Sequence, residues 1–212
     1  REDSLLALAA DLAQRSADLE SRSARVEELE NLLAARDRAA DVLRSRLQKA
    51  LLGFEGNGLT VEQRNGKVYV SLEAALLFAS GSADVDESGR EILMKLGDVI
   101  ATQQDLEIIV EGHTDTDKLS STSIPRNNWE LSVIRATSVL EIIMGQPGVD
   151  PSILTASGRG EFHPVHPEDK SMNRRIEVVL APKLDDLFEL FKGDATTDVL
   201  RVLEIHKGLK LQ

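Results

Sequence analysis

Apolar side chains recur every seven residues through the first 50 residues of the chain. The repeat consists of Leu5, Leu12, Leu19, Val26, Leu33, Ala40 and Leu47. A spacing of seven keeps one side of a helix turned toward a partner helix, and residues 1–52 contain no glycine, proline or aromatic residue to interrupt it. We therefore predict a coiled-coil helix over 1–52 that dimerises in parallel and serves as a spacer about 70 Å long.

A second repeat, three residues further on, is mixed. Apolar residues such as Leu8, Leu29 and Leu43 alternate there with the arginines Arg15 and Arg22. Charged residues at this heptad position weaken a coiled coil and hydrate its middle. The alternative interpretation is a single amphipathic helix that packs back on the rest of the chain.

The periodicity changes after a linker at 53–58, where three glycines occur within six positions. The elements expected beyond it are a hairpin over 59–71 that turns at Arg64-Asn65-Gly66, helices around 92–100 and 127–145, and strands near 106–111, 154–157 and 174–180. This alternation implies βαβ units with right-handed crossovers. For 59–182 we predict an α/β fold, an α+β sandwich in which a βαβαβ-type mixed sheet carries helices on one face. Residues 183–212 are expected to form a helical tail.

The composition excludes several classes of protein. A net charge of -11 and a pI near 4.9 make nucleic acid an unsuitable partner. Because the chain has no cysteine, disulfides, thiolate metal sites and cysteine catalysis are impossible. No apolar run reaches the roughly 20 residues that a membrane helix needs. The chain begins with Arg1 instead of Met, so we expect that an upstream anchor, either a membrane helix or a lipid, is missing from this sequence.

The residues with the clearest chemistry follow the buried strand and open the second helix. Asp115 comes just after the strand, where open α/β sheets place ligands. Asn128 and Arg135 are seven residues apart, about two helical turns, so both project from one face of the helix. An acid, an amide and a guanidinium therefore converge near a helix N-terminus. Such a set suits a zwitterion, because the carboxylate can pair with an ammonium and the guanidinium with a carboxylate.

Four ordered motifs resemble those of a known family. The pattern is a GHTD turn, then N-x-x-LS-x-x-RA on a helix, then G-x-G, then NRR before the last strand; here it comprises Gly112–Asp115, Asn128–Ala136, Gly158–Gly160 and Asn173–Arg175. This order resembles the OmpA-like peptidoglycan-binding domain, and the long loop followed by NWELS resembles the branch of that family found in MotB. The resemblance covers about residues 59–185.

The resemblance implies a periplasmic module of the cell envelope that binds the peptidoglycan stem peptide non-covalently through diaminopimelate. Carried over by motif, Asp115 binds the ammonium of diaminopimelate and Arg135 binds its carboxylate. Asn128 hydrogen-bonds the peptide. One of Arg174 or Arg175 lines the pocket, because strand alternation lets only one of the two face inward.

Two further positions follow from the same comparison of motifs. Thr114 is expected to contribute its backbone to the site. The loop over 116–126 is longer than in the short-looped branch of the family, so its contacts do not carry over. A purely structural interpretation also exists, in which Asn128 only starts the helix and Arg135 forms an ion pair with Asp115.

The histidines are not expected to bind a metal. His163 and His166 lie three residues apart with Glu161 nearby, but Pro164 and Pro167 indicate a loop. We interpret His113 as a packed residue at the end of a strand, and we expect no metal and no cofactor.

Three classes of function remain to be compared. The leading one is an anchoring module, a homodimer whose coiled coil crosses the periplasm and whose globular end holds the wall. The second is a stator-type subunit of a proton-driven motor, with its membrane helix upstream of this sequence; whether the inner or the outer membrane holds the anchor stays open. The third, a wall-cleaving enzyme, is disfavoured, because the sequence has no paired carboxylates, catalytic triad or metal set to perform hydrolysis.

Overall fold

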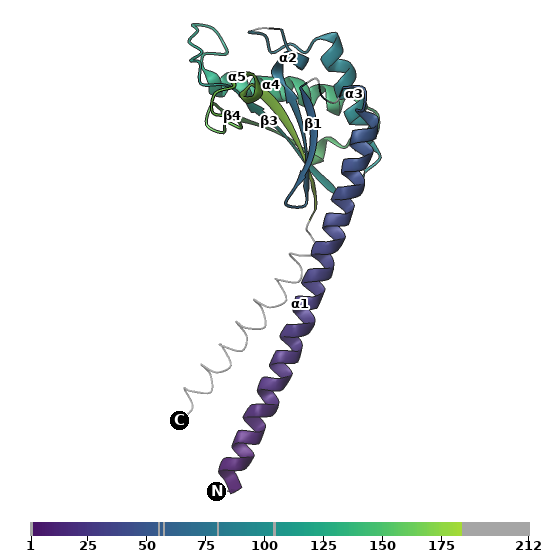
Figure 1. Cartoon of the computed structure of the whole chain (residues 1–212), viewed down its shortest axis with the longest axis vertical. Helices are drawn as coiled ribbons and strands as arrows, with labels where there is room; N and C mark the ends of the chain where they lie inside the picture. The colour runs from purple at the N-terminus through teal and green to yellow at the C-terminus, as the bar shows by residue number, and fades with distance from the viewer. Residues whose placement is uncertain (1, 55, 57, 80, 104, 184–212) are drawn as a thin grey trace. The chain divides into compact units, whose positions relative to one another are not determined.

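The computed structural model describes residues 2–54, 56, 58–79, 81–103 and 105–183. Its longest element is helix α1 (Glu2–Ala50) (Figure 1). A compact unit spans Asp37–Lys183, and the residues before Asp37 fall outside it. The expected tail at 183–212 lies, from residue 184 onward, outside the described residues.

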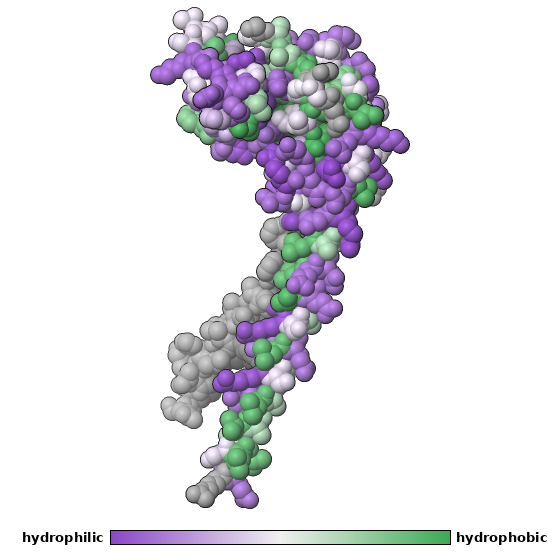
Figure 2. Space-filling model, viewed as in Figure 1, coloured by the Kyte–Doolittle hydropathy of each residue, from purple (hydrophilic) through white to green (hydrophobic). Residues whose placement is uncertain are grey.

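Residues 2–36 of α1 form a helix with an exposed apolar stripe. The apolar stripe consists of Leu5, Leu12, Leu19, Val26 and Leu33, each of which is 40% to 67% exposed. Figure 2 shows apolar residues on the surface of this part of the helix. Two arginines of the second repeat pair along the helix, Arg15 with Asp11 at 2.9 Å and Arg22 with Asp18 at 3.1 Å. Such pairs, four residues apart, support the helix modestly in solvent.

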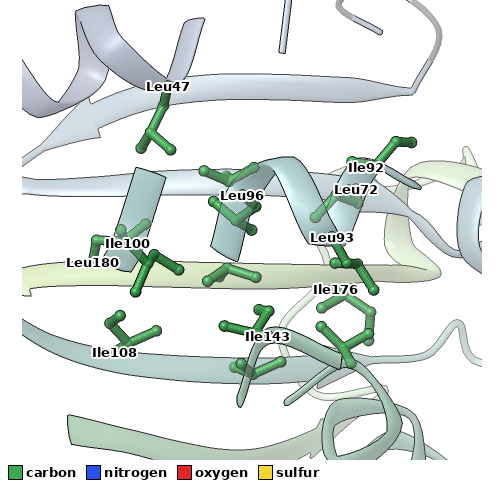
Figure 3. Close-up of a cluster of buried hydrophobic side chains, with 14 of the residues drawn as sticks. Leu47, Leu72, Ile92, Leu93, Leu96, Ile100, Ile108, Ile143, Ile176 and Leu180 are labelled. Carbon is green, nitrogen blue, oxygen red and sulfur yellow. The ribbon is translucent and has the colours of Figure 1, made fainter. Parts of the chain in front are cut away.

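The last turns of α1 belong to the compact unit. Ala40, Leu43 and Leu47 are buried there together with Leu51, which follows the helix, and Figure 3 places Leu47 at one edge of the apolar cluster. The seven-residue repeat therefore continues into the core of the domain. For these turns the alternative interpretation, a helix that packs on the globular part, is the correct one.

A five-stranded mixed sheet lies at the centre of the compact unit, as predicted. Its order is β1 (Leu59–Arg64), β2 (Lys67–Glu73), β5 (Arg175–Pro182), β3 (Leu106–His113) and β4 (Leu154–Gly160). Only the β3–β4 pair is parallel, and the other three pairs are antiparallel. The expected hairpin turns at Asn65 and Gly66, both with positive φ, as a tight Asn-Gly turn requires.

The helices that lie wholly within the compact unit are α2 (Ala74–Leu77), α3 (Glu87–Ala101), α4 (Asn128–Met144), η1 (Pro151–Ile153) and α5 (Lys170–Asn173). All but α2 begin at a position capped by a side chain. The Asp86 side chain accepts a hydrogen bond from Gly89 N at the start of α3, and Asn127 accepts one from Glu130 N at the start of α4. These caps satisfy amide groups that the first turn leaves unpaired. The start of α4 is where the sequence predicts it, whereas α3 begins five residues earlier than expected.

One face of the sheet carries the apolar core. Ile108 and Val110 of β3 and Val178 and Leu180 of β5 are fully buried, and Figure 3 shows the α3 and α4 side chains packed over this face. The core is aliphatic, and its stability comes from apolar area removed from water, about 25 cal/mol per Å². The other face carries the alternate residues of the same strands, which include charged groups near the carboxyl end of β3.

Candidate ligand-binding site

Two glycines allow α4 to lie directly against the strands that carry the candidate site. A Cβ atom on Gly112 would lie 2.0 Å from the Ser132 carbonyl oxygen, and one on Gly158 would lie 2.5 Å from Ser132 Oγ. Any side chain at either position would therefore push the helix away from β3 and β4. This close approach explains why a glycine opens the GHTD motif and why another opens the G-x-G motif.

Ser132 and Gly160 hold the same junction by hydrogen bonds. Ser132 Oγ donates to the Trp129 carbonyl oxygen at 2.8 Å and accepts from Gly160 N at 3.2 Å. The Gly160 carbonyl oxygen accepts from Thr114 N at 2.9 Å. Thr114 is thus a structural link through its backbone amide, while its Oγ1 has no hydrogen-bond partner among the described residues.

Asp115 forms a short ion pair with Arg174. Asp115 Oδ2 lies 2.6 Å from Arg174 Nη1, and Asp115 Oδ1 accepts a hydrogen bond from Asp117 N at 2.9 Å. The Asp115 side chain is only 9% exposed, whereas that of Arg174 is 45% exposed. The carboxylate is therefore fixed inside the protein, and its guanidinium partner lies at the surface.

Asn128 fixes the loop that follows β3. Its Nδ2 donates to the carbonyl oxygens of Asp115 at 3.3 Å and Asp117 at 3.0 Å. The helix cap is the preceding residue, Asn127. Asn128 is therefore more than a residue that starts the helix, because it is buried and holds Asp115 in place.

Arg135 lies in the same region but does not pair directly with Asp115. Its Nε and Nη2 both donate to the Ser82 carbonyl oxygen, at 2.9 and 2.8 Å, and its guanidinium lies 4.9 Å from the centre of the Phe78 ring. Burial lowers the pKa of Arg135, the charge of Arg174 lowers it further, and Asp115 opposes both effects. The direct Asp115–Arg135 ion pair of the purely structural interpretation is therefore wrong.

Arg175 faces away from Asp115. Its Nε donates to Glu177 Oε1 at 2.8 Å, and its Nη1 donates to the His163 carbonyl oxygen at 3.3 Å. Arg174 is consequently the member of the NRR motif that lies beside Asp115. The sequence left these two arginines as alternatives.

The structure thus brings together one buried carboxylate and two guanidiniums, which we call the Asp115 cluster (Asp115, Arg135 and Arg174). The cluster has one positive charge in excess, so an anionic group is its natural complement. Sequence reasoning missed the contribution of Ser82 and Phe78, which orient Arg135. Ser82 acts through its carbonyl group, so its side chain gives no signal of this role.

A family model matches most of the compact unit. Residues 77–176 match the OmpA family. These residues form an OmpA-like domain. The match includes β3, α4, β4 and the whole Asp115 cluster.

Known proteins with OmpA-like domains resemble this chain over the same region. The chain is 28% identical over 118 residues to Motility protein B of Bacillus subtilis, which covers 54% of the chain and 45% of that relative. A putative MotB-like protein from Desulfovibrio vulgaris has a TM-score of 0.64 at 26% identity, over 73% of this chain and 98% of that one. The cell wall anchor of the T6SS from Pseudomonas aeruginosa has a TM-score of 0.58 at 28% identity, over 66% of this chain and 99% of that one. The chain spans about half the length of the motility proteins it matches.

These relatives place the OmpA-like domain in the MotB branch, as the motifs predict. Domains of this family are structural peptidoglycan-binding modules and not enzymes. Within the described residues, no helix is both long and apolar enough to cross a membrane.

Proposed function

We propose that this OmpA-like domain binds peptidoglycan through the diaminopimelate residue of the stem peptide and thereby anchors its protein to the cell wall. The observation that carries the proposal is the Asp115 cluster, which combines one buried carboxylate with two guanidiniums. The free end of diaminopimelate bears an ammonium and a carboxylate on one carbon atom. Opposite charges at neighbouring places in one site match this pair.

The ammonium of the ligand takes the position at Asp115 that Arg174 now occupies. Arg174 Nη1 is the group 2.6 Å from Asp115 Oδ2, so it stands where a ligand cation would stand. Because the Arg174 side chain is half-exposed, it can turn outward at little cost. It then remains close enough to contribute to binding of the ligand carboxylate.

The carboxylate of the ligand binds to Arg135. A guanidinium carries five N–H donors, and Ser82 accepts hydrogen bonds only from Nε and Nη2. The remaining donors, on Nη1 and Nη2, can hold a carboxylate in bidentate fashion. Burial of the Arg135 guanidinium strengthens such a bond, because less water competes for it.

Asn128 contributes a contact to the peptide backbone. Its Nδ2 already donates to the carbonyl oxygens of Asp115 and Asp117. Its Oδ1 can therefore accept a hydrogen bond from an amide N–H of the stem peptide. Thr114 supports the site through its backbone link to Gly160, in place of a direct contact with the ligand.

The proposal is tested by co-sedimentation with purified sacculi. Arg135→Ala should lose about 2 to 4 kcal/mol of binding free energy, because it removes a charge-assisted bidentate contact and leaves the ligand carboxylate with Arg174 alone. Arg90→Ala is the matched control, since Arg90 is an exposed arginine of α3. It should sediment like the parent protein.

Circular dichroism must show that the Arg135→Ala protein is folded. If the folded variant co-sediments with sacculi as well as the parent does, the assignment of Arg135 is wrong. If the parent itself does not co-sediment, the proposed function is wrong.

We also propose that residues 2–36 of α1 join two copies of the chain in a parallel coiled coil. The apolar stripe on these residues is exposed in the single chain, and a repeat of seven is the pattern that a partner helix covers. Light scattering should give a dimer for residues 1–183 and a monomer for residues 37–183. A fragment starting near Gly56 is unsuitable, because it would lack the core residues Leu43 and Leu47.

The dimer proposal has a matched pair of variants. Leu12→Asp lies in the apolar stripe and should dissociate the dimer, whereas Leu6→Asp is equally exposed but outside the repeat and should leave the dimer intact. Equal masses for residues 1–183 and 37–183, each a monomer, would contradict the coiled coil.

A stator-type subunit of a proton-driven motor is the second candidate function. The observation that favours it is the similarity to Motility protein B of Bacillus subtilis. Both functions place the domain in the periplasm and need the same hold on the wall. Deletion of the gene distinguishes them, since a strain that loses motility supports the motor and a strain that swims normally supports a static anchor.

A further inference from the structure

Three potential metal ligands meet on the sheet face opposite the apolar core. Glu111 and His113 come from β3 and Glu177 comes from β5, where Glu111 is the register partner of Glu177. One ligand atom of each residue lies within 4.8 Å of the others. Residues 111 and 113 alternate with the core residue Val110 and with Gly112, so their side chains emerge on the other face of the sheet.

His113 is a buried polar side chain without a partner. It is 4% exposed, and neither ring nitrogen has a hydrogen-bond partner among the described residues. Its Nε2 lies 3.8 Å from Glu111 Oε2, which is too far for a hydrogen bond. Most buried polar groups in proteins are satisfied, and an exception calls for a specific cause such as an absent ion.

The electrostatic surroundings keep this imidazole neutral. Burial lowers the pKa of His113 to about 3, and the nearby charge of Arg175 acts in the same direction. A neutral imidazole has a lone pair on one ring nitrogen and is the form of histidine that ligates metals, and both nitrogens of His113 are without a hydrogen-bond partner among the described residues.

We propose that Glu111, His113 and Glu177 bind one divalent transition-metal ion, for which zinc is the best match. Zinc accepts imidazole nitrogen and carboxylate oxygen together, and a site with three protein ligands completes its tetrahedron with water. Ligand atoms around tetrahedral zinc lie about 3.3 Å apart. The three side chains therefore need only small rotations to close on the ion.

Two arginines already neutralise the carboxylates, and they define how the metal binds. Arg175 Nε is bonded to Glu177 Oε1 and is buried, so it stays in place. Arg159 Nη2 is bonded to Glu111 Oε1 at 2.5 Å, but its side chain is 43% exposed. The metal replaces Arg159 at Glu111, and the Arg159 side chain turns into solvent.

A surface hollow borders one member of this group, Glu177. A hollow of about 380 Å³ is lined by Glu177 and Arg175 together with Thr60, Ser71 and Glu73. A hydrated ion can approach Glu177 through it. The site thus has ligands of the right chemistry and an unsatisfied histidine, and one of its carboxylates borders a surface hollow.

The test is isothermal titration of zinc into protein freed of metal with EDTA. We expect one zinc ion per chain for the parent protein. Glu111→Gln should weaken binding at least tenfold, whereas Glu107→Gln, an exposed glutamate of the same strand, should leave it unchanged. Arg159→Gln should tighten binding, because it removes the cation that competes with the metal.

Two further measurements separate this site from the loop histidines and from loss of fold. His166→Gln should bind zinc like the parent, since His166 Nδ1 already accepts a hydrogen bond from Asp169 N at 2.8 Å. Circular dichroism should show that Glu111→Gln is folded. The proposal is overturned if the parent binds no zinc, if folded Glu111→Gln binds it as tightly as the parent, or if Arg159→Gln does not bind it more tightly.

Discussion

Two groups of charged side chains at the carboxyl end of β3 differ in how their charges are matched. In the Asp115 cluster, one carboxylate faces two guanidiniums, and the ion pair that closes it is half-exposed on the arginine side. The second group, which we call the Glu111 cluster, consists of Glu111, His113, Arg159, Arg175 and Glu177. In that cluster each of the two carboxylates is paired with a guanidinium and the imidazole is neutral, and Arg64 lies at its edge, 4.0 Å from Glu177.

This difference in charge determines which kind of ligand each cluster can bind. The excess positive charge of the Asp115 cluster can bind the carboxylate of a zwitterionic ligand. Asp115 can bind the ammonium of the same ligand, as we propose for diaminopimelate. In the Glu111 cluster both carboxylates are already paired with arginines. The cluster therefore stabilises the fold, and it can bind only a cation that displaces one of those arginines. Neighbouring residues of one motif, Arg174 and Arg175, therefore have different tasks.

The largest expected effect comes from substituting Arg175 and Arg174 by alanine in separate variants. Arg175→Ala leaves the buried Glu177 carboxylate with only the half-exposed Arg64, whose Nη2 lies 4.0 Å from Glu177 Oε1, and should lower the free energy of unfolding by about 3 to 5 kcal/mol. Arg174→Ala removes a half-exposed partner, and the buried Asp115 carboxylate keeps the hydrogen bond from Asp117 N and the nearby charge of Arg135. The loss should therefore be smaller, about 1 to 2 kcal/mol. Urea denaturation of both variants gives the comparison directly.

Sacculus binding should rank the two variants differently. Under conditions where both are folded, Arg175→Ala should bind like the parent, because Arg175 does not contact the Asp115 cluster. Equal losses of stability in the two variants would contradict the distinction between the two clusters. A loss of binding confined to Arg175→Ala would show that their roles are reversed.

A smaller effect is expected from pH. His113 has a pKa of about 3 in the folded protein and about 6.5 when unfolded, so between these values only the unfolded chain takes up a proton. The stabilisation is complete above pH 6.5 and declines as the pH falls toward 3. From pH 7 to pH 5 this histidine should lower the free energy of unfolding by about 2 kcal/mol.

Urea denaturation in EDTA at the two pH values measures the contribution of His113. His113→Gln should lack the corresponding part of the pH dependence, whereas His166→Gln should retain it. If His113→Gln and the parent lose stability equally between pH 7 and pH 5, His113 is not held neutral by its surroundings.

Much of the fold was predictable because its signals are local. The Asn65-Gly66 turn and the cap at Asn127 each depend on a few adjacent residues, and both lie where the sequence places them. The repeat that includes Leu47 is different. A heptad pattern predicts that one side of a helix is buried. It does not indicate whether a second chain or the chain's own sheet covers that side.

The sequence predicts which residues form the site better than it predicts which groups those residues contact. The motifs identify Asp115, Arg135 and the two arginines of the NRR motif. Strand alternation predicts that Arg174 and Arg175 face opposite ways, but Arg174 precedes β5, and only the folded structure shows that it is the one beside Asp115. The bond from Arg135 to Ser82 spans 53 residues and ends on a backbone carbonyl, so no pattern of side chains could reveal it.

The central claim is that the Asp115 cluster binds both charges of diaminopimelate, and one measurement tests it most directly. Isothermal titration compares synthetic stem peptides that carry diaminopimelate or lysine at the same position. Lysine keeps the ammonium but lacks the second carboxylate, so Arg135 is desolvated without a partner. We expect the parent protein to prefer the diaminopimelate peptide at least about tenfold, or roughly 1.4 kcal/mol, and Arg135→Ala to lose most of this preference. Equal affinities of the parent protein for the two peptides would contradict the claim.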